Sequence, residues 1–498
     1  MLINAKTLIS RTSFVPIKQH IIPSVSIFVC LTMSMKIILL IISSLLILNS
    51  YVYGTFDINT NPECNYLNEH VIDLSETDMR RLRKPLIISD KIFCIHVENN
   101  NISEMAYKTF NKVPNLKYLN LAGNLLSFDK LNFNRHGSIE ILVLDQALRS
   151  KLAVSNRRNL LKHLMHMEDS KTENSITFTP AFTLPKLKKL YLRGNRITSV
   201  LTDVWLDELF PNITHLYLSD NQISKTNFMK YVPSSLTHLY LDKNNIEKIE
   251  NVPLNTLEVL NVDYNNINQL CGLTSKDCKG IKLIDAINLK VLSVSQSRLE
   301  QIDQDAFSNV TKLEYLDLSH NSLQKINKTI FEPLVNLSSL RLDSNQFQVL
   351  PDFESLTNLS HLSFQDNKIE SIDEFDFKGL SKLKEINLRG NAIVDIHPEA
   401  FYQLNELEVL NLSHNKLRFL SDNWISPQSV LRDLDLSHNF FYFFDGFGLS
   451  NAVQLKNLNI SNNEFTSISI PMLTYLSFNV TLEIGSTCIE STKLYSSS

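Results

Sequence analysis

One short pattern of apolar residues recurs along most of the chain and constrains its fold more than any other feature. In the segment LEYLDLSHNSL, residues 313–323, leucines occupy positions 1, 4, 6 and 11, and an asparagine occupies position 9. The pattern returns in steps of mostly 21–26 residues, with 24 the commonest, which is the signature of stacked repeats. The step from Ala147 to Asn195 is twice 24 residues, which predicts a decayed repeat near Ser170. A last partial unit near Thr487 brings the total to about 16–17 repeats. The ninth positions are Asn100, Asn124, Ala147, Asn195, Asn221, Asn244, Asn265, Ser297, Asn321, Asn345, Asn367, Asn391, Asn415, Asn439 and Asn463.

The spacing of the apolar positions predicts a short strand followed by a turn. Amphipathic helices would show steps of three and four residues instead. Positions 4 and 6 should point inward while positions 3 and 5 point outward, and neighbouring repeats must stack into one parallel sheet to bury their leucines. We expect the inward asparagine at position 9 to bond the backbone of adjacent turns. Phenylalanines ten residues after position 9 should stack as a second spine on the convex side; they are Phe110, Phe307, Phe331, Phe377 and Phe401.

The composition excludes several classes of protein. The 498 residues include 77 Leu and 51 Asn, an unusual pair for a soluble chain. Hydrophobic residues make up 43% and charged residues 20%, which excludes disorder as the main state. The 48 basic and 52 acidic side chains create no strong field of either sign, so nucleic acid is disfavoured as a partner.

Residues 35–54 have the order of a secretory signal peptide. Lys36 precedes an apolar run from Ile37 to Leu48, and the small residues Val52 and Gly54 follow. A membrane anchor is the alternative, but the run is shorter than the about 20 residues that a spanning helix needs. We therefore expect a secreted, extracellular chain that begins near Thr55 and has no membrane span once mature. Residues 1–34 are interpreted as an upstream extension outside the native structure.

The repeat unit resembles a known family. The unit LxxLxLxxNxLxxIxxxxFxxLxxL, as in LEYLDLSHNSLQKINKTIFEPLVNL, is similar to the extracellular "typical" leucine-rich repeat. The resemblance covers roughly residues 60–488 and is nearest to Toll-receptor ectodomains and the secreted leucine-rich immune proteins of insects. It implies an α/β horseshoe with a concave parallel sheet. The expected parts are an N-terminal cap (55–91), the repeat array (92–488) and a polar tail (489–498).

The resemblance also implies a function. No membrane helix or signalling domain follows Leu482, no cysteine-rich cap or coiled-coil tail appears, and the polar ending TKLYSSS is unlike a lipid-anchor signal. We expect a secreted recognition protein that binds a macromolecular ligand, protein or glycan, in innate immunity or Toll-like signalling. The alternative is an extracellular adhesion or matrix-assembly protein.

The cysteines fit an oxidising compartment. Without the leader the chain keeps five cysteines, and we predict disulfides Cys64–Cys94 and Cys271–Cys278. A zinc site is the competing interpretation, but the spacing without paired histidines does not favour it. Cys488 then remains for an intermolecular bridge, which would make a dimer, or as a free thiol; a buried reduced cysteine is the alternative.

Asparagine-linked glycans are a second expectation of secretion. Each site that is used must lie on the surface. The nine N-x-S/T sequons are at Asn101, Asn212, Asn309, Asn327, Asn336, Asn358, Asn411, Asn459 and Asn479.

Catalytic motifs are absent from the sequence. We find no HExxH, GxSxG, P-loop or dinucleotide fingerprint in a suitable context, so we expect no enzyme, cofactor or metal site. His320, His414 and His438 recur at position 8 and are interpreted as solvated repeat residues.

The candidate ligand surface lies on three successive repeats, around residues 187–243. Position 5 is tyrosine in each, at Tyr191, Tyr217 and Tyr240, and position 3 is histidine in two of them, at His215 and His238. Tyrosine combines a large contact area with a hydroxyl group, which suits binding, although it also packs well on exposed strands. Lys188, Lys189 and Arg193 border the row, whereas glycans on Asn411 and Asn459 would obstruct the same concave face elsewhere.

A second candidate surface is the aromatic segment HNFFYFFDGF, residues 438–447. By repeat register Phe441 and Phe444 should point inward, which leaves Phe440, Tyr442 and Phe443 outside. Phe419 is equivalent to Phe443 one repeat earlier. Clustered exposed aromatics mark contact surfaces, including those of dimers; lateral packing within a thick flank is the alternative.

Overall fold

The computed structural model describes residue 64 and residues 70–83, 85–149, 174–202, 204–249, 252, 254–422, 424–443, 447–465 and 480–484. The chain divides into two units, residues 1–59 and 60–498, and all described residues belong to the second. The signal peptide, the upstream extension, Ser170, Phe444, Asn479, Cys488 and the polar tail lie outside the described residues. These expectations stay predictions.

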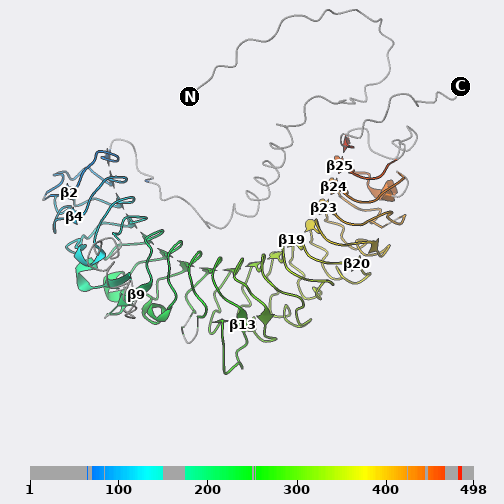
Figure 1. The fold of residues 1–498 in the computed structure, drawn as a ribbon, viewed down its shortest axis with the longest axis horizontal. Coiled ribbons are helices and arrows are strands. Elements are labelled where there is room, and N and C mark those ends of the chain that lie inside the picture. Colours follow the sequence, from blue (N-terminus) through cyan, green and yellow to red (C-terminus); the bar gives the residue numbers. More distant parts are fainter. Residues whose placement is uncertain are drawn as a thin grey trace, which may run out of the picture. The chain divides into compact units, whose positions relative to one another are not determined.

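A parallel sheet of 17 strands dominates the second unit. Each strand pairs with the strand of the next repeat, and Figure 1 shows them along the inner side of the curved array. The strands are β1 (Val71–Asp73), β3 (Cys94–His96), β5 (Tyr118–Asn120), β6 (Ile141–Val143), β8 (Lys189–Tyr191), β10 (His215–Tyr217), β11 (His238–Tyr240), β12 (Val259–Asn261), β15 (Val291–Ser293), β17 (Tyr315–Asp317), β18 (Ser339–Arg341), β19 (His361–Ser363), β21 (Glu385–Asn387), β23 (Val409–Asn411), β24 (Asp433–Asp435), β25 (Asn457–Asn459) and β26 (Thr481–Glu483).

The register of this sheet follows the apolar pattern. Position 4 pairs with position 4 of the next repeat, as Leu316 of β17 does with Leu340 of β18. The leucines at positions 4 and 6 are buried in one continuous core, as the stacking argument requires. The predicted solenoid with a concave parallel sheet is confirmed.

Two strand pairings in the sheet were not expected from the repeat spacing. β6 pairs directly with β8, Leu142 opposite Leu190, although 48 residues separate the two. β6 and β8 are therefore direct neighbours in the sheet, and the decayed repeat expected near Ser170 falls within residues 150–173, outside the described part of the chain. In addition, β1 pairs with β3 and adds a strand within segment 55–91, which was expected to form the N-terminal cap.

The asparagine at position 9 binds the backbone as predicted. The Asn321 Nδ2 donates to the carbonyl oxygens of Val294, Leu318 and Ser319 at 2.7–3.1 Å. Its Oδ1 accepts from the backbone N–H groups of Ser297 and Leu299 at 3.0 and 2.9 Å. One side chain thus satisfies five buried backbone groups of two neighbouring repeats, which explains why the residue recurs.

Position 8 explains the repeated histidines. His320, His414 and His438 have φ of 53°, 55° and 54°, in the left-handed region. Gly194 and Gly390 occupy the same position with φ of 66° and 69°. Asn, Asp, His and Gly are the residues that tolerate this region best. The turn after each strand therefore accommodates histidine, as it does Lys243, Tyr264 and Ser344 at the same position.

The convex side holds short strands and little helix (Figure 1). The predicted phenylalanines are all buried there, and Phe377 lies 5.2 Å from Phe401 between ring centroids. The short strands are β2 (Arg81–Leu82), β4 (Glu104–Met105), β7 (Ser175–Phe178), β9 (Ser199–Thr202), β13 (Gln269–Cys271), β14 (Ile281–Lys282), β16 (Gln301–Ile302), β20 (Ser371–Ile372) and β22 (Asp395–Ile396). Helix in the described ranges is confined to α3 (Leu206–Leu209) and the 3-10 helices η2 (Phe128–Lys130), η4 (Pro180–Phe182), η5 (Asn227–Tyr231) and η7 (Leu449–Asn451).

Candidate ligand-binding surface

The three tyrosines form a stack across β8, β10 and β11. Their positions are opposite one another in the sheet register. The rings of Tyr191 and Tyr217 are 4.1 Å apart and inclined by 4°, and those of Tyr217 and Tyr240 are 4.6 Å apart and inclined by 2°. The strand spacing of about 4.8 Å imposes this near-parallel stacking on equal residues of successive repeats.

The exposure of this stack differs from the sequence-based expectation. The exposed fractions of Tyr191, Tyr217 and Tyr240 are 1%, 2% and 1%. Stacked rings cover one another's faces, and the Arg193 guanidinium lies 5.1 and 5.9 Å from the centroids of Tyr191 and Tyr217. The tyrosines thus form an inner layer of the concave face instead of an open ladder. Their role in binding stays a prediction.

Arg193 is itself held in place by a carboxylate. Its Nη2 lies 2.7 Å from Asp145 Oδ2, and its Nε donates to the same oxygen at 2.8 Å. Burial raises the pKa of Asp145, and the hydrogen bonds and charge of Arg193 oppose that shift. The pair fixes the guanidinium over the tyrosine rings.

Beside the tyrosines, position 3 carries half-buried polar side chains. Lys189, His215 and His238 are opposite one another in register, and the two imidazoles stack at 4.0 Å. Thr214 and Thr237 each place Oγ1 2.8 Å from Nδ1 of the histidine that follows. These bonds fix both ring orientations. Both histidines are half-buried, whereas the three tyrosines are almost fully buried, so the histidines are the more accessible of the five candidate residues.

A row of aspartates that was not expected from the sequence continues the concave face. Asp263 Oδ1 accepts from Ser293 Oγ and Ser295 N, each at 2.6 Å. Burial, and then the charge of Asp317, raise the pKa of Asp263 to about 7. Asp343 likewise accepts from Ser363 Oγ and from the backbone of the next repeat, and burial raises its pKa. Aspartate at position 7 followed by serine at position 5 of the next repeat was the signal available in the sequence.

The repeats toward β25 use position 5 differently. Asn411, Asp435 and Asn459 each accept a hydrogen bond from the N–H two residues later, at 3.0, 2.9 and 3.1 Å. This Asx turn holds the side chain against its own backbone at the end of the strand. Position 5 thus carries short polar side chains in these repeats and stacked tyrosine rings in β8, β10 and β11.

The aromatic segment has the predicted orientation where it is described. Phe441 is fully buried, whereas Phe443 is 71% exposed and Phe419 is 59% exposed. Phe440 and Tyr442 are also exposed. We call Phe419, Phe440, Tyr442 and Phe443 the aromatic flank patch.

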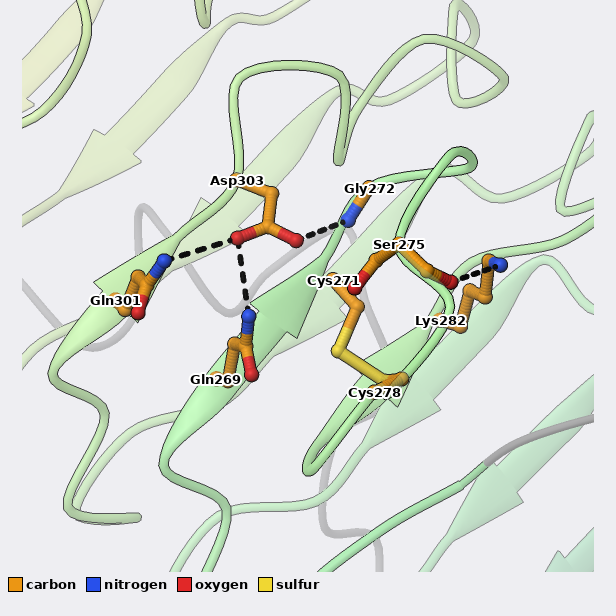
Figure 2. The surroundings of a disulfide bond; sticks show 8 residues. All are labelled: Gln269, Cys271, Gly272, Ser275, Cys278, Lys282, Gln301 and Asp303. Carbon is orange, nitrogen blue, oxygen red and sulfur yellow. Dashed lines mark hydrogen bonds between the residues drawn. A yellow bond between two sulfur atoms is a disulfide. The ribbon is translucent and has the colours of Figure 1, made fainter.

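Among the described residues, the predicted disulfides Cys64–Cys94 and Cys271–Cys278 are both present. Figure 2 shows the second at the end of β13, the central strand of the short sheet formed by β14, β13 and β16. Asp303 accepts from Gly272 N at 2.9 Å and from Gln269 and Gln301 Nε2 at 3.0 and 3.2 Å, which ties this loop to the next repeat. The long repeat is thus a closed insertion on the convex side.

Across the described ranges, no helix has the length and apolar character needed to cross a bilayer.

Comparison with protein families identifies the repeats directly. Family models described as leucine-rich repeat match residues 287–347, 352–393, 381–441 and 454–476. Rat lumican is 25% identical over 267 residues, which are 53% of this chain and 61% of lumican. Human lumican is 26% identical over 229 residues, 43% of this chain and 63% of lumican. The chain thus spans about three fifths of the length of these curated relatives.

Solved structures agree on the fold. A leucine-rich repeat protein of Leptospira interrogans has a TM-score of 0.53 at 20% identity, covering 83% of this chain and 95% of its own. The Drosophila Toll–Spätzle complex gives 0.55 at 18% identity, covering 80% of this chain and 55% of that chain. A complex of TLR13 with single-stranded RNA has a TM-score of only 0.39, which is too low to indicate a shared fold. The expected exclusion of nucleic acid as a partner receives no support from these comparisons. The chain thus contains leucine-rich repeats, and its fold resembles that of the Toll chain in this complex.

Proposed function

We propose that this protein is an extracellular recognition protein that binds a macromolecular ligand, protein or glycan, through the concave face of residues 187–243. The observation that carries the proposal is the row of Lys189, His215 and His238 beside the stacked tyrosines, in which hydrogen bonds orient both imidazoles. Side chains whose orientations are already fixed lose little entropy on binding. The proposal assigns no catalytic activity.

Two further observations support an extracellular role. Disulfides persist in oxidising compartments, and Cys271–Cys278 closes a loop on the convex side of the array. The Toll complex is described as a hub in development and innate immunity, which places a structural neighbour in that setting. We therefore extend the proposal to an immune role.

Capture from native extracellular fluid tests the proposal. The purified mature chain should retain a specific ligand, and the double variant His215→Ala/His238→Ala should bind it about tenfold more weakly. The matched control is His414→Ala/His438→Ala, because these rings also stack, at 3.9 Å, but at position 8 of distant repeats. Equal binding by both double variants and the wild type would place the ligand elsewhere.

An adhesive or matrix-assembly role is the second candidate, and the aromatic flank patch favours it. Exposed aromatic side chains in adjacent repeats offer a contact surface for self-association. Sedimentation velocity of the wild type and Phe443→Ser distinguishes the roles. A concentration-dependent dimer that the variant loses would support assembly, and a monomer in both would remove it.

A further inference from the structure

The sequons differ in what the asparagine amide already does in the fold. In Asn212, Asn336 and Asn358, Nδ2 donates to a backbone carbonyl oxygen of the preceding repeat, at 2.8 Å in each case. Asn115 and Asn288, which are not in sequons, make the same bond at 2.7 Å. Asparagine at this repeat position therefore has a structural role that is independent of glycosylation.

Asn411 and Asn459 have a different arrangement on the concave face. Asn411 Oδ1 accepts from the N–H and Oγ of Ser413, at 3.0 and 2.7 Å. Asn459 Oδ1 accepts from the same groups of Ser461, at 3.1 and 2.8 Å. These bonds hold the carbonyl oxygen against the strand end, so Nδ2 lies on the other side of the amide. Within the described part of the chain, no hydrogen bond uses Nδ2 of either residue.

Other asparagines at position 5 vary in this respect. Asn261, which is not in a sequon, forms the same turn at 2.9 Å, and no hydrogen bond within the described residues uses its Nδ2. Asn120 and Asn387 form the same turn, at 3.0 and 3.1 Å, but lie outside sequons. Their Nδ2 groups donate to side chains of the preceding repeat, Glu98 and Gln365 respectively. The two concave sequon residues leave this atom uncommitted, whereas these two matched residues do not.

We propose that Asn411 and Asn459 carry N-linked oligosaccharides that project from the concave face. The donor is an oligosaccharide on a polyisoprenyl diphosphate. Nδ2 forms a bond to the anomeric carbon, the bond from that carbon to the diphosphate oxygen breaks, the diphosphate leaves with the electron pair, and Nδ2 loses one proton. Because Nδ2 makes no bond within the described residues, the folded repeat accommodates the product without losing one.

The two glycans would divide the concave face. β24 lies between β23 and β25, so the attachment sites are about 10 Å apart, two strand spacings. Asp435 lies between them in register. Oligosaccharides here would cover this part of the face and direct a ligand toward residues 187–243. This consequence rests on the proposed function and deepens it, because it names the part of the face that the ligand leaves unused.

Site occupancy tests the proposal directly. The chain is expressed in eukaryotic cells behind a heterologous secretory leader and treated with peptide-N-glycosidase F in heavy-oxygen water. Mass spectrometry should find Asn411 and Asn459 converted to labelled aspartate in most molecules. Asn411→Gln and Asn459→Gln should each lose one oligosaccharide, whereas the control Asn387→Gln should lose none.

Unmodified Asn411 and Asn459 would overturn the proposal. Chains retained inside the cells are analysed in the same way, so poor secretion cannot hide the result. Failure of the native leader to direct secretion would count against the proposed function and not against these sites.

Shielding has its own measurement. Asp435→Cys, in a Cys488→Ser background, is labelled with maleimide-polyethylene glycol. Labelling should be several-fold slower than in the same chain with Asn411→Gln and Asn459→Gln added. Equal rates would show that the glycans do not cover the face.

Discussion

Two sectors of the concave face share one framework and differ at a single repeat position. In the sector of β8, β10 and β11, position 5 is tyrosine and the rings stack into a buried layer. In the sector of β23, β24 and β25, position 5 is Asn or Asp and caps the strand end. The asparagine network at position 9 is the same in both. The repeat therefore fixes the backbone, while position 5 decides whether a sector offers a rigid aromatic layer or polar side chains.

The largest expected effect is in the tyrosine sector. Tyr217→Ala removes a buried ring that stacks on two others, so we expect a loss of about 3–4 kcal/mol in the free energy of unfolding, near the values for buried aromatic residues. Asn411→Ala is the matched change in the other sector and should cost about 1 kcal/mol or less. Urea denaturation of bacterially produced, unglycosylated protein measures both. Similar losses would show that the sectors do not differ in packing.

The shared framework should respond equally in both sectors. Asn221 and Asn415 each bond backbone groups of two repeats. Asn221→Ala and Asn415→Ala should each cost about 2–3 kcal/mol, because they leave buried N–H and C=O groups unpaired. Unequal losses in denaturant titrations would show that the network is not a common framework.

The sequence predicts position 9 well and position 5 poorly, for a physical reason. The role of asparagine at position 9 depends only on the backbone of its own and adjacent turns, so one repeat contains the information. The burial of Tyr217 depends on Tyr191, Tyr240 and Arg193, which come from three repeats and two different positions. A contact that several repeats build together cannot be inferred from the pattern of one.

The double step before Asn195 shows the same limit for the fold. Spacing alone cannot separate a decayed repeat from an insertion, because both preserve the later register. The direct pairing of Leu142 with Leu190 shows that β6 and β8 are neighbours in the sheet, which the spacing did not predict. Likewise, His414 and His438 share a positive backbone φ with other residues at position 8, and only the structure shows that conformation.

The aspartate row between the sectors predicts a pH dependence. The pKa of Asp263 is about 7 in the folded chain and near its ordinary value of 3.8 when unfolded. The stability linked to this carboxyl is therefore fully present below pH 4 and is lost as the pH rises through 7. Asp263→Asn keeps an acceptor for Ser293 and Ser295 without the charge, so it should be more stable than the wild type at pH 8 by at least about 1 kcal/mol. The difference should disappear near pH 4, and urea titrations at both values check it; an unchanged difference would assign the effect to packing.

The smallest effect tests the polar sector alone. Asp435→Ala removes the acceptor for the Ser437 N–H, a bond of 2.9 Å at the half-buried end of β24, and should cost about 0.5–1 kcal/mol. Asp435→Asn retains an acceptor oxygen at that place, so in unglycosylated protein it should match the wild type within the error of denaturant titration. If both substitutions are neutral, the Asx turn does not stabilise the strand end, and the polar sector would depend on its leucine core and position-9 asparagines alone. If both are equally destabilising, the charge of Asp435 and not its hydrogen bond matters, and the distinction between a capped sector and an aromatic sector would have to be recast as one of electrostatics.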